Sequence, residues 1–426
     1  MLLFALMCLF RGAIFFTPCA RVLTGPETVV FSRNLAYEFG AWILLLLIMI
    51  NLWSCLLTEY SIYPSQRYLL RGFLISLSII SVCFFCETSL LKFYVYFELS
   101  LVPILVILIG WGYQFERISA SKAIILYTTI ASLPLLLLIL RVSNRGVDYL
   151  NQIGTGGVFF LKARRLRWAA YLAFLVKLPI FYFHIWLPKA HVEAPVVGSI
   201  FLAAVLLKLG GYGLIKIKSF LERSSHAWAG LSALSLWAFI YVGGVCVQAS
   251  DIKVLIAFSS VAHMAFSVLV LGRGIRRGVA CAYLILIRHG IRSSAAFFFR
   301  FLLYKNRHTR NLLLNKRGGS SLGMSLFFWA LICLGVIGAP PTFNLWVEIS
   351  SLIIIVLSSS VSVKLLFWGA FLGGVYSFFL IAAPLSYNTQ FLFSKKTTFP
   401  GITLVHLIQI SYCLRGLRIL CPRRLN

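Results

Sequence analysis

Long apolar runs separated by short polar segments make up most of the chain. A helix needs about 20 mostly apolar residues to cross a bilayer. Only helices and closed barrels satisfy every backbone polar group in lipid, and runs of this length are too long for barrel strands. The pattern therefore predicts an all-α polytopic membrane protein. Four runs contain no Asp, Glu, Lys or Arg: residues 41–57, 123–140, 227–250 and 254–272.

Further apolar runs contain a few ionisable residues or have less distinct ends. Residues 322–358 are too long for one straight helix and contain Pro340 and Pro341, so we expect a broken span there. Pro179 predicts a second helix break. In total we expect about thirteen transmembrane helices, in an orientation that the basic residues leave open. The further runs are residues 1–16, 69–86, 88–111, 168–187, 194–215, 278–299, 365–385 and 403–420.

The composition excludes an ordinary soluble protein. Only 12% of the residues are charged and 60% are hydrophobic, whereas a typical soluble chain carries roughly 25% charged residues. The mean hydropathy is +0.93. Lys and Arg number 39 against 11 Asp and Glu, a net charge of +28. Because the basic residues lie between apolar runs, the excess favours anionic lipid headgroups and acidic neighbouring subunits over nucleic acid.

No cofactor motif accompanies these runs. Cys83 and Cys86 form the only C-x-x-C sequence, inside an apolar run, and we interpret them as core residues. The sequence lacks the glycine-rich phosphate-binding motifs, so nucleotide binding by this chain is unsupported. His184, His191 and Glu193 are metal-ligand types, but the prolines among them break the regular spacing, and we expect no metal.

Two acidic residues stand inside apolar sequence, whereas the other nine lie in loops or at span ends, where we expect water to reach them. They are Glu98, five residues before Pro103, and Glu348, which follows the double proline. A charge at the centre of a membrane helix costs at least ~2.5 to 3.5 kcal/mol, so such residues usually face a bundle interior and pair or titrate. We expect a functional role, with a fixed buried salt bridge as the alternative.

Two lysines and two histidines complete the set of polar residues within apolar runs. Lys177 and Lys208 are too far from predicted helix ends to reach water easily. Burial favours the neutral form of an amine and a nearby carboxylate favours its charged form, so these groups suit a proton relay. His263 and His289 add imidazoles, the side chains that ordinarily titrate near neutral pH, although a histidine that only packs in the core is about as frequent.

The polar residues lie within distinctive strings. These are FELSLVPILVILIGWGYQFER, FLVKLPIFYFHIWLPKAHVEAPVVGSIFLAAVLLKLGGYG, SDIKVLIAFSSVAHMAFSV and GAPPTFNLWVEI. In this order they resemble the chain 4 family of the respiratory NADH:ubiquinone oxidoreductase, complex I. The resemblance covers most of residues 88–385. The stretch from Lys177 to Gly213 separates this family from the two related antiporter-like subunits.

The resemblance implies a proton-pumping, antiporter-like subunit of the membrane arm, with two inverted helix bundles that contain the broken helices. It implies that NADH, FMN, iron-sulfur clusters and ubiquinone are used by the complex and not by this chain. By matching motif, it assigns Glu98 as a charge partner, Lys177 as the central lysine, Lys208 as the connecting lysine, His263 and His289 as relay groups and Glu348 as the terminal carboxylate.

Three features depart from the family pattern. Arg288 and Arg292 flank His289, where the family is normally uncharged. One span is missing before the FELSL helix. The charge of +28 exceeds the near-neutral balance of these subunits, which predicts acidic accessory subunits or bound phospholipid such as cardiolipin.

The resemblance also sets expectations for organisation and location. We expect N-terminal helices over residues 1–87, a proton-translocating core over 88–385, and a C-terminal helix with a basic tail over 386–426. The partners would be the other membrane-arm subunits, including the two other antiporter-like subunits. The apolar N-terminus has no transit-peptide character, which favours synthesis inside a mitochondrion and a place in the mitochondrial inner membrane.

Two other functions fit parts of the same pattern. A cation/proton antiporter outside complex I would use the same Glu and Lys residues, although the FELSL and VKLP strings favour complex I. A membrane scaffold would use the buried charges only to fix helix packing. In a scaffold, Glu98→Gln and Lys177→Met would impair assembly, whereas a translocator would assemble and pump poorly.

Overall fold

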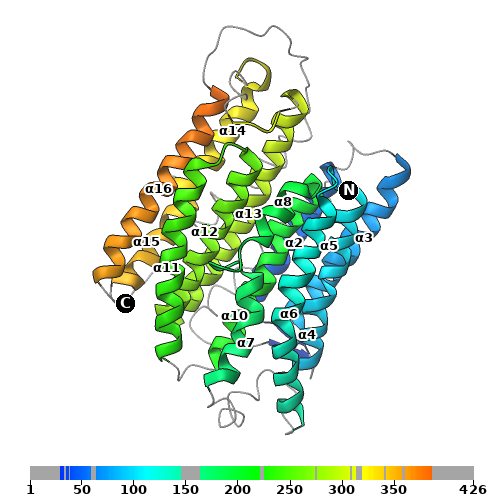
Figure 1. Ribbon diagram of the computed structural model, residues 1–426, viewed down its shortest axis with the longest axis vertical. Helices are drawn as coiled ribbons and strands as arrows, with labels where there is room; N and C mark the ends of the chain where they lie inside the picture. Colours follow the sequence, from blue (N-terminus) through cyan, green and yellow to red (C-terminus); the bar gives the residue numbers. More distant parts are fainter. Residues whose placement is uncertain are drawn as a thin grey trace.

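The fold was examined in a computed structural model of the chain (Figure 1). The structure describes residues 29–385 except 33–34, 38, 59–63, 145–163, 221–224, 274–275, 308, 313–318, 340–341 and 357–359. Nearly all of the described residues are helical, in agreement with the predicted fold class. The described residues also contain two strands, β1 (Val29–Ser32) and β2 (Leu35–Tyr37), which pair as a small antiparallel hairpin.

The helices run roughly along the long axis of the molecule (Figure 1). In chain order they are α2 (Phe39–Thr58), α3 (Pro64–Cys86), α4 (Leu90–Leu99), α5 (Leu101–Trp111), α6 (Arg117–Ser143), α7 (Arg164–Lys177), α8 (Trp186–Glu193), α9 (Val196–Phe201), the π-helical η5 (Leu202–Leu206), α10 (Leu207–Phe220), α11 (Ser225–Gln248), α12 (Ile252–Arg273), α13 (Arg276–Arg307), α14 (Gly319–Ile337), α15 (Phe343–Val356) and α16 (Ser360–Leu385).

The count of about thirteen spans is not confirmed. Among the described residues, 7 helical stretches are long and apolar enough to cross a membrane, and three further apolar helices are shorter. The predicted spans 1–16 and 403–420 lie outside the described residues. The 7 stretches are Gln66–Cys86, Leu90–Trp111, Arg117–Ser143, Val196–Lys218, Trp228–Gln248, Ile252–Gly272 and Val363–Ala383.

The predicted span 168–187 is interrupted near Pro179, where a helix break was expected. Helix α7 ends at Lys177 and α8 begins only at Trp186. Proline has no N–H to donate and its ring clashes with the carbonyl of the preceding turn, which stops the helix. Tyr182, inside the break, has a φ of 74°. The last residue of α7 is therefore a lysine placed at a helix end inside the protein.

A second break divides the predicted span 322–358. Helix α14 ends at Ile337 and α15 begins at Phe343, and Gly338 adopts a φ of 75°. Glycine is the residue that enters this left-handed region without steric cost. Pro340 and Pro341 themselves lie outside the described residues.

Two further irregularities occur. The span 88–111 is interrupted at Ser100, which separates α4 from α5, and Pro103 cannot donate a hydrogen bond to the preceding turn. In the predicted span 194–215, the π-helical η5 lies directly before Lys208. Such π-helical turns leave the regular hydrogen-bond ladder and often occur at functional sites.

The centre of the bundle consists of the helices that carry the candidate polar residues. The stretch Val196–Lys218 is 94% buried and Ile252–Gly272 is 89% buried, whereas Arg117–Ser143 is 39% and Val363–Ala383 28% buried. One continuous apolar cluster extends from Leu44 in α2 to Tyr376 in α16. The more exposed helices form the rim of the bundle, and their exposed side chains are mainly apolar, as a lipid-facing surface requires.

Helix α10 approaches α7 closely through Gly210. A Cβ added to Gly210 would lie 3.1 Å from both the Leu178 nitrogen and the Phe174 oxygen. Backbone atoms cannot move aside as a flexible side chain does, so a larger residue would push the two helices apart. The close contact also fixes the position of Lys177, which lies between Phe174 and Leu178 in sequence.

We predict that Gly210→Val lowers the stability of the protein by about 1–3 kcal/mol, the usual range for overpacking a core. The measurement is the thermal denaturation of the detergent-solubilised protein. Gly244→Val is the matched control, because a Cβ at Gly244 in α11 meets nothing within 4 Å. Equal melting temperatures for the two variants would show that the α7–α10 contact is looser than the structure indicates.

Candidate functional site

The six candidate residues come from six different helices and lie in or beside the core. Four of them are almost fully buried: Lys177 (2% exposed), Lys208 (0%), His263 (5%) and His289 (1%). Because burying a charged or polar group without partners is costly, the partners of each group determine what it can do. The six lie in α4 (Glu98), α7 (Lys177), α10 (Lys208), α12 (His263), α13 (His289) and α15 (Glu348).

Lys177 is held by the end of helix α4. Its ammonium donates to the Phe97 carbonyl oxygen at 2.7 Å and to the Ser100 hydroxyl oxygen at 3.1 Å. It also lies 3.6 Å from the centre of the Phe97 ring, a cation–π geometry. The carbonyl ends of helices carry a partial negative charge and lack intrahelical partners. The break after Leu99 therefore supplies this cation with acceptors.

Glu98 lies beside this contact without joining it. Glu98 and Lys177 interact electrostatically, but within the described residues they form no ion pair at 4.0 Å or less. The Glu98 Oε1 atom is buried, with no hydrogen-bond partner among the described side chains and backbone. The structure thus places the predicted partners near each other while the lysine is bonded to the backbone of α4.

Lys208 forms a direct hydrogen bond with His289. The Lys208 Nζ and His289 Nδ1 atoms are 2.8 Å apart, and Nζ also donates to the Ala203 carbonyl oxygen at 2.5 Å. Ala203 lies in η5, so the π-helical turn before Lys208 provides an acceptor for its ammonium. When Lys208 is charged, His289 Nδ1 accepts the hydrogen bond from its ammonium group. A neutral His289 then carries its own proton on Nε2. The sequence resemblance gives Lys208 and His289 separate roles and does not pair them, whereas the structure brings them into contact.

Arg288 connects His263 with Glu348. Its Nη1 atom lies 3.1 Å from Glu348 Oε1 and its Nη2 atom lies 3.3 Å from His263 Nδ1. The His263 and His289 rings have their centres 6.0 Å apart. Because arginine only donates, His263 Nδ1 accepts, and His263 Nε2 is left buried without a partner in the described part of the chain. The histidines and Glu348 therefore form one cluster.

The break between α14 and α15 positions Glu348. Asn344 donates to Glu348 Oε1 at 2.8 Å and also donates to the Gly335 carbonyl oxygen. Gly335 is in the last turn of α14, so Asn344 ties the two sides of the break together. A Cβ at Gly338 would collide with Glu348 Oε2. Glycine is thus required at this position for its backbone angle and for the space that the carboxylate occupies.

The candidate residues fall into two groups rather than one continuous chain. In the described residues, the hydrogen bonds of Lys177 lead to α4 and those of Lys208 lead to η5 and α13. Phe174 and Leu178 pack against Gly210 where α7 meets α10. An apolar contact therefore lies where α7, which ends at Lys177, passes the helix that carries Lys208.

Sequence reasoning missed several partners. Arg288 was noticed as a departure from the family pattern but not as the counter-ion of Glu348, although an arginine and a glutamate within apolar runs are a usable signal for pairing. Ser100 and Asn344 gave no signal, because isolated Ser and Asn residues are frequent in membrane helices. Their roles depend on breaks whose position the structure defines.

The expectation that water reaches the other nine acidic residues is wrong for two of those that the structure describes. Glu87 is 8% exposed and Glu193 is 3% exposed. The Glu87 carboxylate accepts hydrogen bonds from the Thr88 and Ser89 backbone, just before α4 begins. Glu193 ends α8, where the buried Lys253 ammonium donates to the neighbouring Val192 and Ala194 carbonyl oxygens. Local partners therefore replace water at Glu87, whereas the Glu193 Oε2 atom is buried with no hydrogen-bond partner in the described part of the chain.

The residues considered as metal ligands lie apart. His191 stacks on Phe297 with ring centres 4.7 Å apart, and His184 stacks on Phe181. Within the described ranges there is no group of three or more His, Cys, Asp or Glu residues placed to hold a metal ion. Of the C-x-x-C pair, Cys86 is buried and Cys83 is partly buried.

We predict that Arg288→Met destabilises the protein by roughly 3 kcal/mol, the lower end of the range for removing one partner of a buried ion pair. We expect the lower end of the range because the Glu348 side chain is 27% exposed, so its charge is not fully buried. Adding Glu348→Gln should restore much of this loss, since no unpaired charge then remains. Melting temperatures of the two single variants and the double variant test this, with the exposed Arg141→Met as control. Additive losses in the double variant would contradict the pairing.

Comparisons with known proteins agree on one family. Residues 87–373 match the family model described as "NADH:quinone oxidoreductase/Mrp antiporter, TM". The NADH-ubiquinone oxidoreductase chain 4 of Locusta migratoria is 37% identical over 357 residues, which cover 81% of this chain and 79% of the relative. A chain of the respiratory complex I from Thermus thermophilus has a TM-score of 0.78 at 20% identity, covering 95% of this chain and 88% of that one.

A chain of the Mrp complex from Dietzia sp. has a TM-score of 0.80 at 12% identity, with 93% of this chain and 77% of that chain covered. At such low identities the two solved structures establish the fold alone. The locust relative shares far more of the sequence, and its match extends over most of both chains. This chain therefore belongs to the family of NADH:quinone oxidoreductase and Mrp antiporter membrane proteins and, within it, to the NADH-ubiquinone oxidoreductase chain 4 subunits.

Proposed function

We propose that this chain is a proton-translocating membrane-arm subunit of NADH:ubiquinone oxidoreductase. Energy from the transfer of electrons from NADH to ubiquinone, which occurs elsewhere in the complex, would move protons along the buried polar groups. The observation that carries the proposal is the direct hydrogen bond between the buried side chains of Lys208 and His289, at 2.8 Å. A donor and an acceptor that can exchange a proton are in contact deep inside a membrane bundle.

Lys177 and Glu98 form the first station of the relay. The Lys177 ammonium is bonded to Phe97 and Ser100, while the nearby Glu98 Oε1 atom has no partner among the described residues. A shift of the lysine towards Glu98 would exchange backbone acceptors for a carboxylate. Because a carboxylate stabilises an ammonium more strongly than a neutral carbonyl does, the position of Lys177 would control how tightly it holds its proton.

Lys208, His289 and His263 form the second station. A proton that leaves the Lys208 ammonium has His289 Nδ1 as its nearest acceptor. His289 can then release the proton that it carries on its other ring nitrogen, which is how an imidazole relays a proton. The rings of His289 and His263 are too far apart for direct contact, with centres 6.0 Å apart, so a water molecule between them would complete the transfer.

Glu348 is the terminal station, and Arg288 sets its charge. The guanidinium remains protonated under all ordinary conditions and therefore carries no proton itself. Its contacts with Glu348 and His263 place a fixed positive charge between these two groups. That charge stabilises the Glu348 carboxylate and disfavours a second positive charge on His263. A proton would reach Glu348 only when the contact with Arg288 loosens.

The proposal includes the finer organisation that the sequence suggests. Residues 1–87 would form N-terminal helices, 88–385 the translocating core and 386–426 a C-terminal helix with a basic tail. The complete chain would have about thirteen spans in two inverted bundles, each with a broken helix near its centre. The breaks after Lys177 and after Ile337 support this arrangement, because each lies next to a candidate charge.

The proposal also assigns partners and location. NADH, FMN, iron-sulfur clusters and ubiquinone would bind to other subunits of the complex, and this chain would contribute no redox centre. The neighbours would be the two other antiporter-like subunits, further membrane-arm subunits and accessory subunits, with anionic phospholipid such as cardiolipin at the basic surfaces. The place of work would be the mitochondrial inner membrane, as the name of the locust relative suggests.

A cation/proton antiporter of the Mrp type is the second candidate. The fold supports it, since the Mrp chain superimposes with a TM-score of 0.80. The sequence favours complex I, because identity is 37% with the locust chain 4 and 12% with the Mrp chain. Copurification with NADH-oxidising subunits distinguishes the two candidates, since an antiporter outside complex I would migrate apart from them.

The test of the relay is Lys177→Met in the purified native complex, reconstituted into vesicles. We expect NADH-dependent proton pumping to fall at least about tenfold, equivalent to ~1.4 kcal/mol of lost stabilisation of the rate-limiting step, while the complex still assembles on native electrophoresis. Glu98→Gln should act in the same direction. The exposed Lys189→Met is the matched control and should pump normally. Loss of assembly in Lys177→Met with normal pumping by the remaining complex would support the scaffold alternative instead.

A second test concerns the Lys208–His289 contact. His289→Gln keeps a hydrogen-bonding group near Lys208 but removes the group that accepts and releases a proton. We expect His289→Gln and Lys208→Met to reduce pumping to similar extents, and the double variant to pump no worse than either, because residues that act as one unit have non-additive effects. Pumping rates of the three reconstituted variants measure this. Normal pumping by His289→Gln would remove this histidine from the route.

A further inference from the structure

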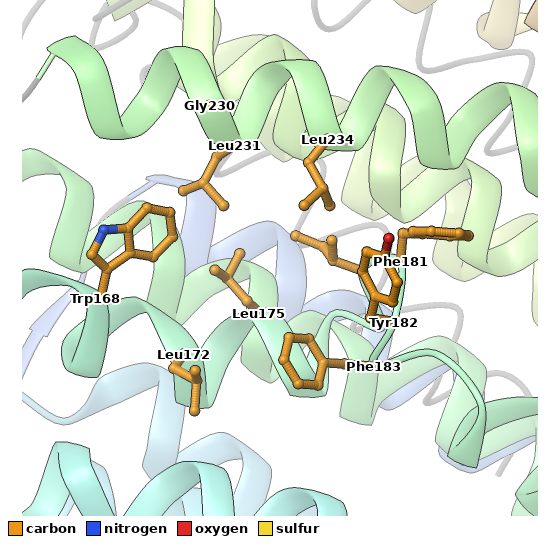
Figure 2. Close-up of a pocket in the computed structure, with 10 residues that line it drawn as sticks. Trp168, Leu172, Leu175, Phe181, Tyr182, Phe183, Gly230, Leu231 and Leu234 are labelled. Atoms are coloured by element: carbon orange, nitrogen blue, oxygen red, sulfur yellow. The ribbon is translucent and has the colours of Figure 1, made fainter.

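An apolar cleft lies between helices α7 and α11, beside the break that follows Lys177. Figure 2 shows Trp168 and Leu231 at one end of it and Leu234, Phe181 and Tyr182 at the other. Its volume is about 130 Å³. The walls come from one face of α7, one face of α11 and the non-helical segment that follows α7. The remaining lining residues are Leu172, Leu175, Ile180, Phe183 and Gly230.

The cleft is suited to a hydrocarbon and not to water. It exposes only apolar atoms, and a water molecule needs two to four polar partners to occupy a cavity. Dry cavities of about 150 Å³ lined by such residues bind apolar molecules of the size of benzene. The cleft opens to the outside of the bundle, where Tyr182 is 70% exposed and Trp168 37% exposed. In a membrane, the apolar molecule that surrounds this surface is the acyl chain of a phospholipid.

Positive charge at one end of the cleft favours an anionic headgroup. Helix α7 begins with Arg164, Arg165 and Arg167, immediately before Trp168. Tyr171 and Trp228 share a hydrogen bond of 3.1 Å, which joins the middle of α7 to the first turn of α11. In both helices the residue numbers rise from the Trp168 end of the cleft towards the other end (Figure 2), so both helices begin at the Trp168 end. Helix N-termini carry a partial positive charge, and arginines near a membrane surface attract anionic headgroups. The positive end thus adjoins the end of the cleft at Trp168.

We propose that an anionic phospholipid binds here, with one acyl chain in the cleft between α7 and α11 and its headgroup at the basic first turn of α7. The site is separate from the polar relay. The acyl chain would cover Ile180 and Phe181, the residues that form the break on its outer side. Phe181 already packs edge-on against Tyr241 of α11 with ring centres 5.0 Å apart, so one aromatic contact and one lipid chain would together close this side of the break.

The location gives the lipid a defined physical task. Segment 179–185 is not helical. Backbone polar groups that face hydrocarbon at membrane depth are costly, and where they face water they become a route for leakage. A chain fixed in the cleft would exclude water from the outer side of the segment that follows Lys177. This consequence rests on the proposed function, whereas the binding site itself does not.

Gly230 provides a selective way to fill the cleft. A Cβ at Gly230 meets nothing within 4 Å, although the residue lines the cleft. Gly230→Trp should therefore occupy the space of the acyl chain without disturbing the core. Gly244 lies on the same helix, away from the cleft, and a Cβ there also meets nothing within 4 Å. Gly244→Trp is the matched control for a new indole on α11.

The experiment measures lipid retention by the native complex. Each purified complex is exchanged into detergent with isotope-labelled phosphatidylglycerol or, in a parallel arm, labelled phosphatidylcholine, and washed, and the retained label is counted by mass spectrometry. We expect Gly230→Trp to retain one phosphatidylglycerol fewer per complex than the wild-type and Gly244→Trp forms. Phosphatidylcholine should not differ among the three. Native electrophoresis checks assembly, and Gly230→Leu replaces the tryptophan variant if that variant fails to assemble.

Three results would overturn the proposal or part of it. Equal phosphatidylglycerol retention by Gly230→Trp and Gly244→Trp would show that no lipid occupies the cleft. Loss of a neighbouring subunit from Gly230→Trp, with lipid retention unchanged, would show that a protein side chain fills it. Equal loss of phosphatidylcholine would overturn the role of the basic end in selecting the headgroup. None of these results depends on whether Lys177→Met impairs pumping, so this proposal and the relay can fail separately.

Discussion

A charge buried inside a membrane bundle must find a partner, and the architecture of this protein follows from how each charge finds one. Most carbonyl groups in the interior of a helix are already bonded to the next turn. Carbonyl groups without an intrahelical partner are found where a helix ends or loosens. Lys177 uses the end of α4, Lys208 uses the π-helical η5 and His289, and Arg288 uses Glu348. The breaks in the helices therefore supply hydrogen-bond acceptors that the charges in the core need.

The break between α14 and α15 shows the same relation in more detail. Gly338 turns the chain with a φ of 75° and leaves the space that Glu348 fills, while Asn344 bonds both to that carboxylate and to the last turn of α14. A break that only relieved helix length would need none of these contacts. The glycine, the amide and the carboxylate together hold the end of one helix and the start of the next in a fixed arrangement, which a relay group requires in order to keep its partner at hydrogen-bonding distance.

Much of this site could be predicted from sequence, because a charged residue within an apolar run is conspicuous wherever it falls. Glu98, Lys177, Lys208 and Glu348 were identified in that way, and proline identified the break after Lys177. The partners could not be predicted. Arg288 and Glu348 are 60 residues apart, and which helices meet depends on packing over the whole bundle. The π-helical turn was also missed, since its local sequence is as apolar as that of a regular helix.

The separation of the polar residues into two groups has a consequence for coupling. Phe174 on α7 and Leu178, just beyond its end, pack against Gly210 on α10, two residues after Lys208. In the proposed relay a proton would pass between these helices. The Phe174 carbonyl oxygen at the contact already accepts a hydrogen bond from the Leu178 N–H, and a site without free polar partners stays dry. A continuous hydrogen-bonded chain would let protons equilibrate across the membrane without doing work. A dry contact between two stations blocks that leak, and it can open only when the charges on either side make hydration favourable. If the proposed relay operates, the separation of the two groups of polar residues prevents protons from equilibrating freely across the membrane.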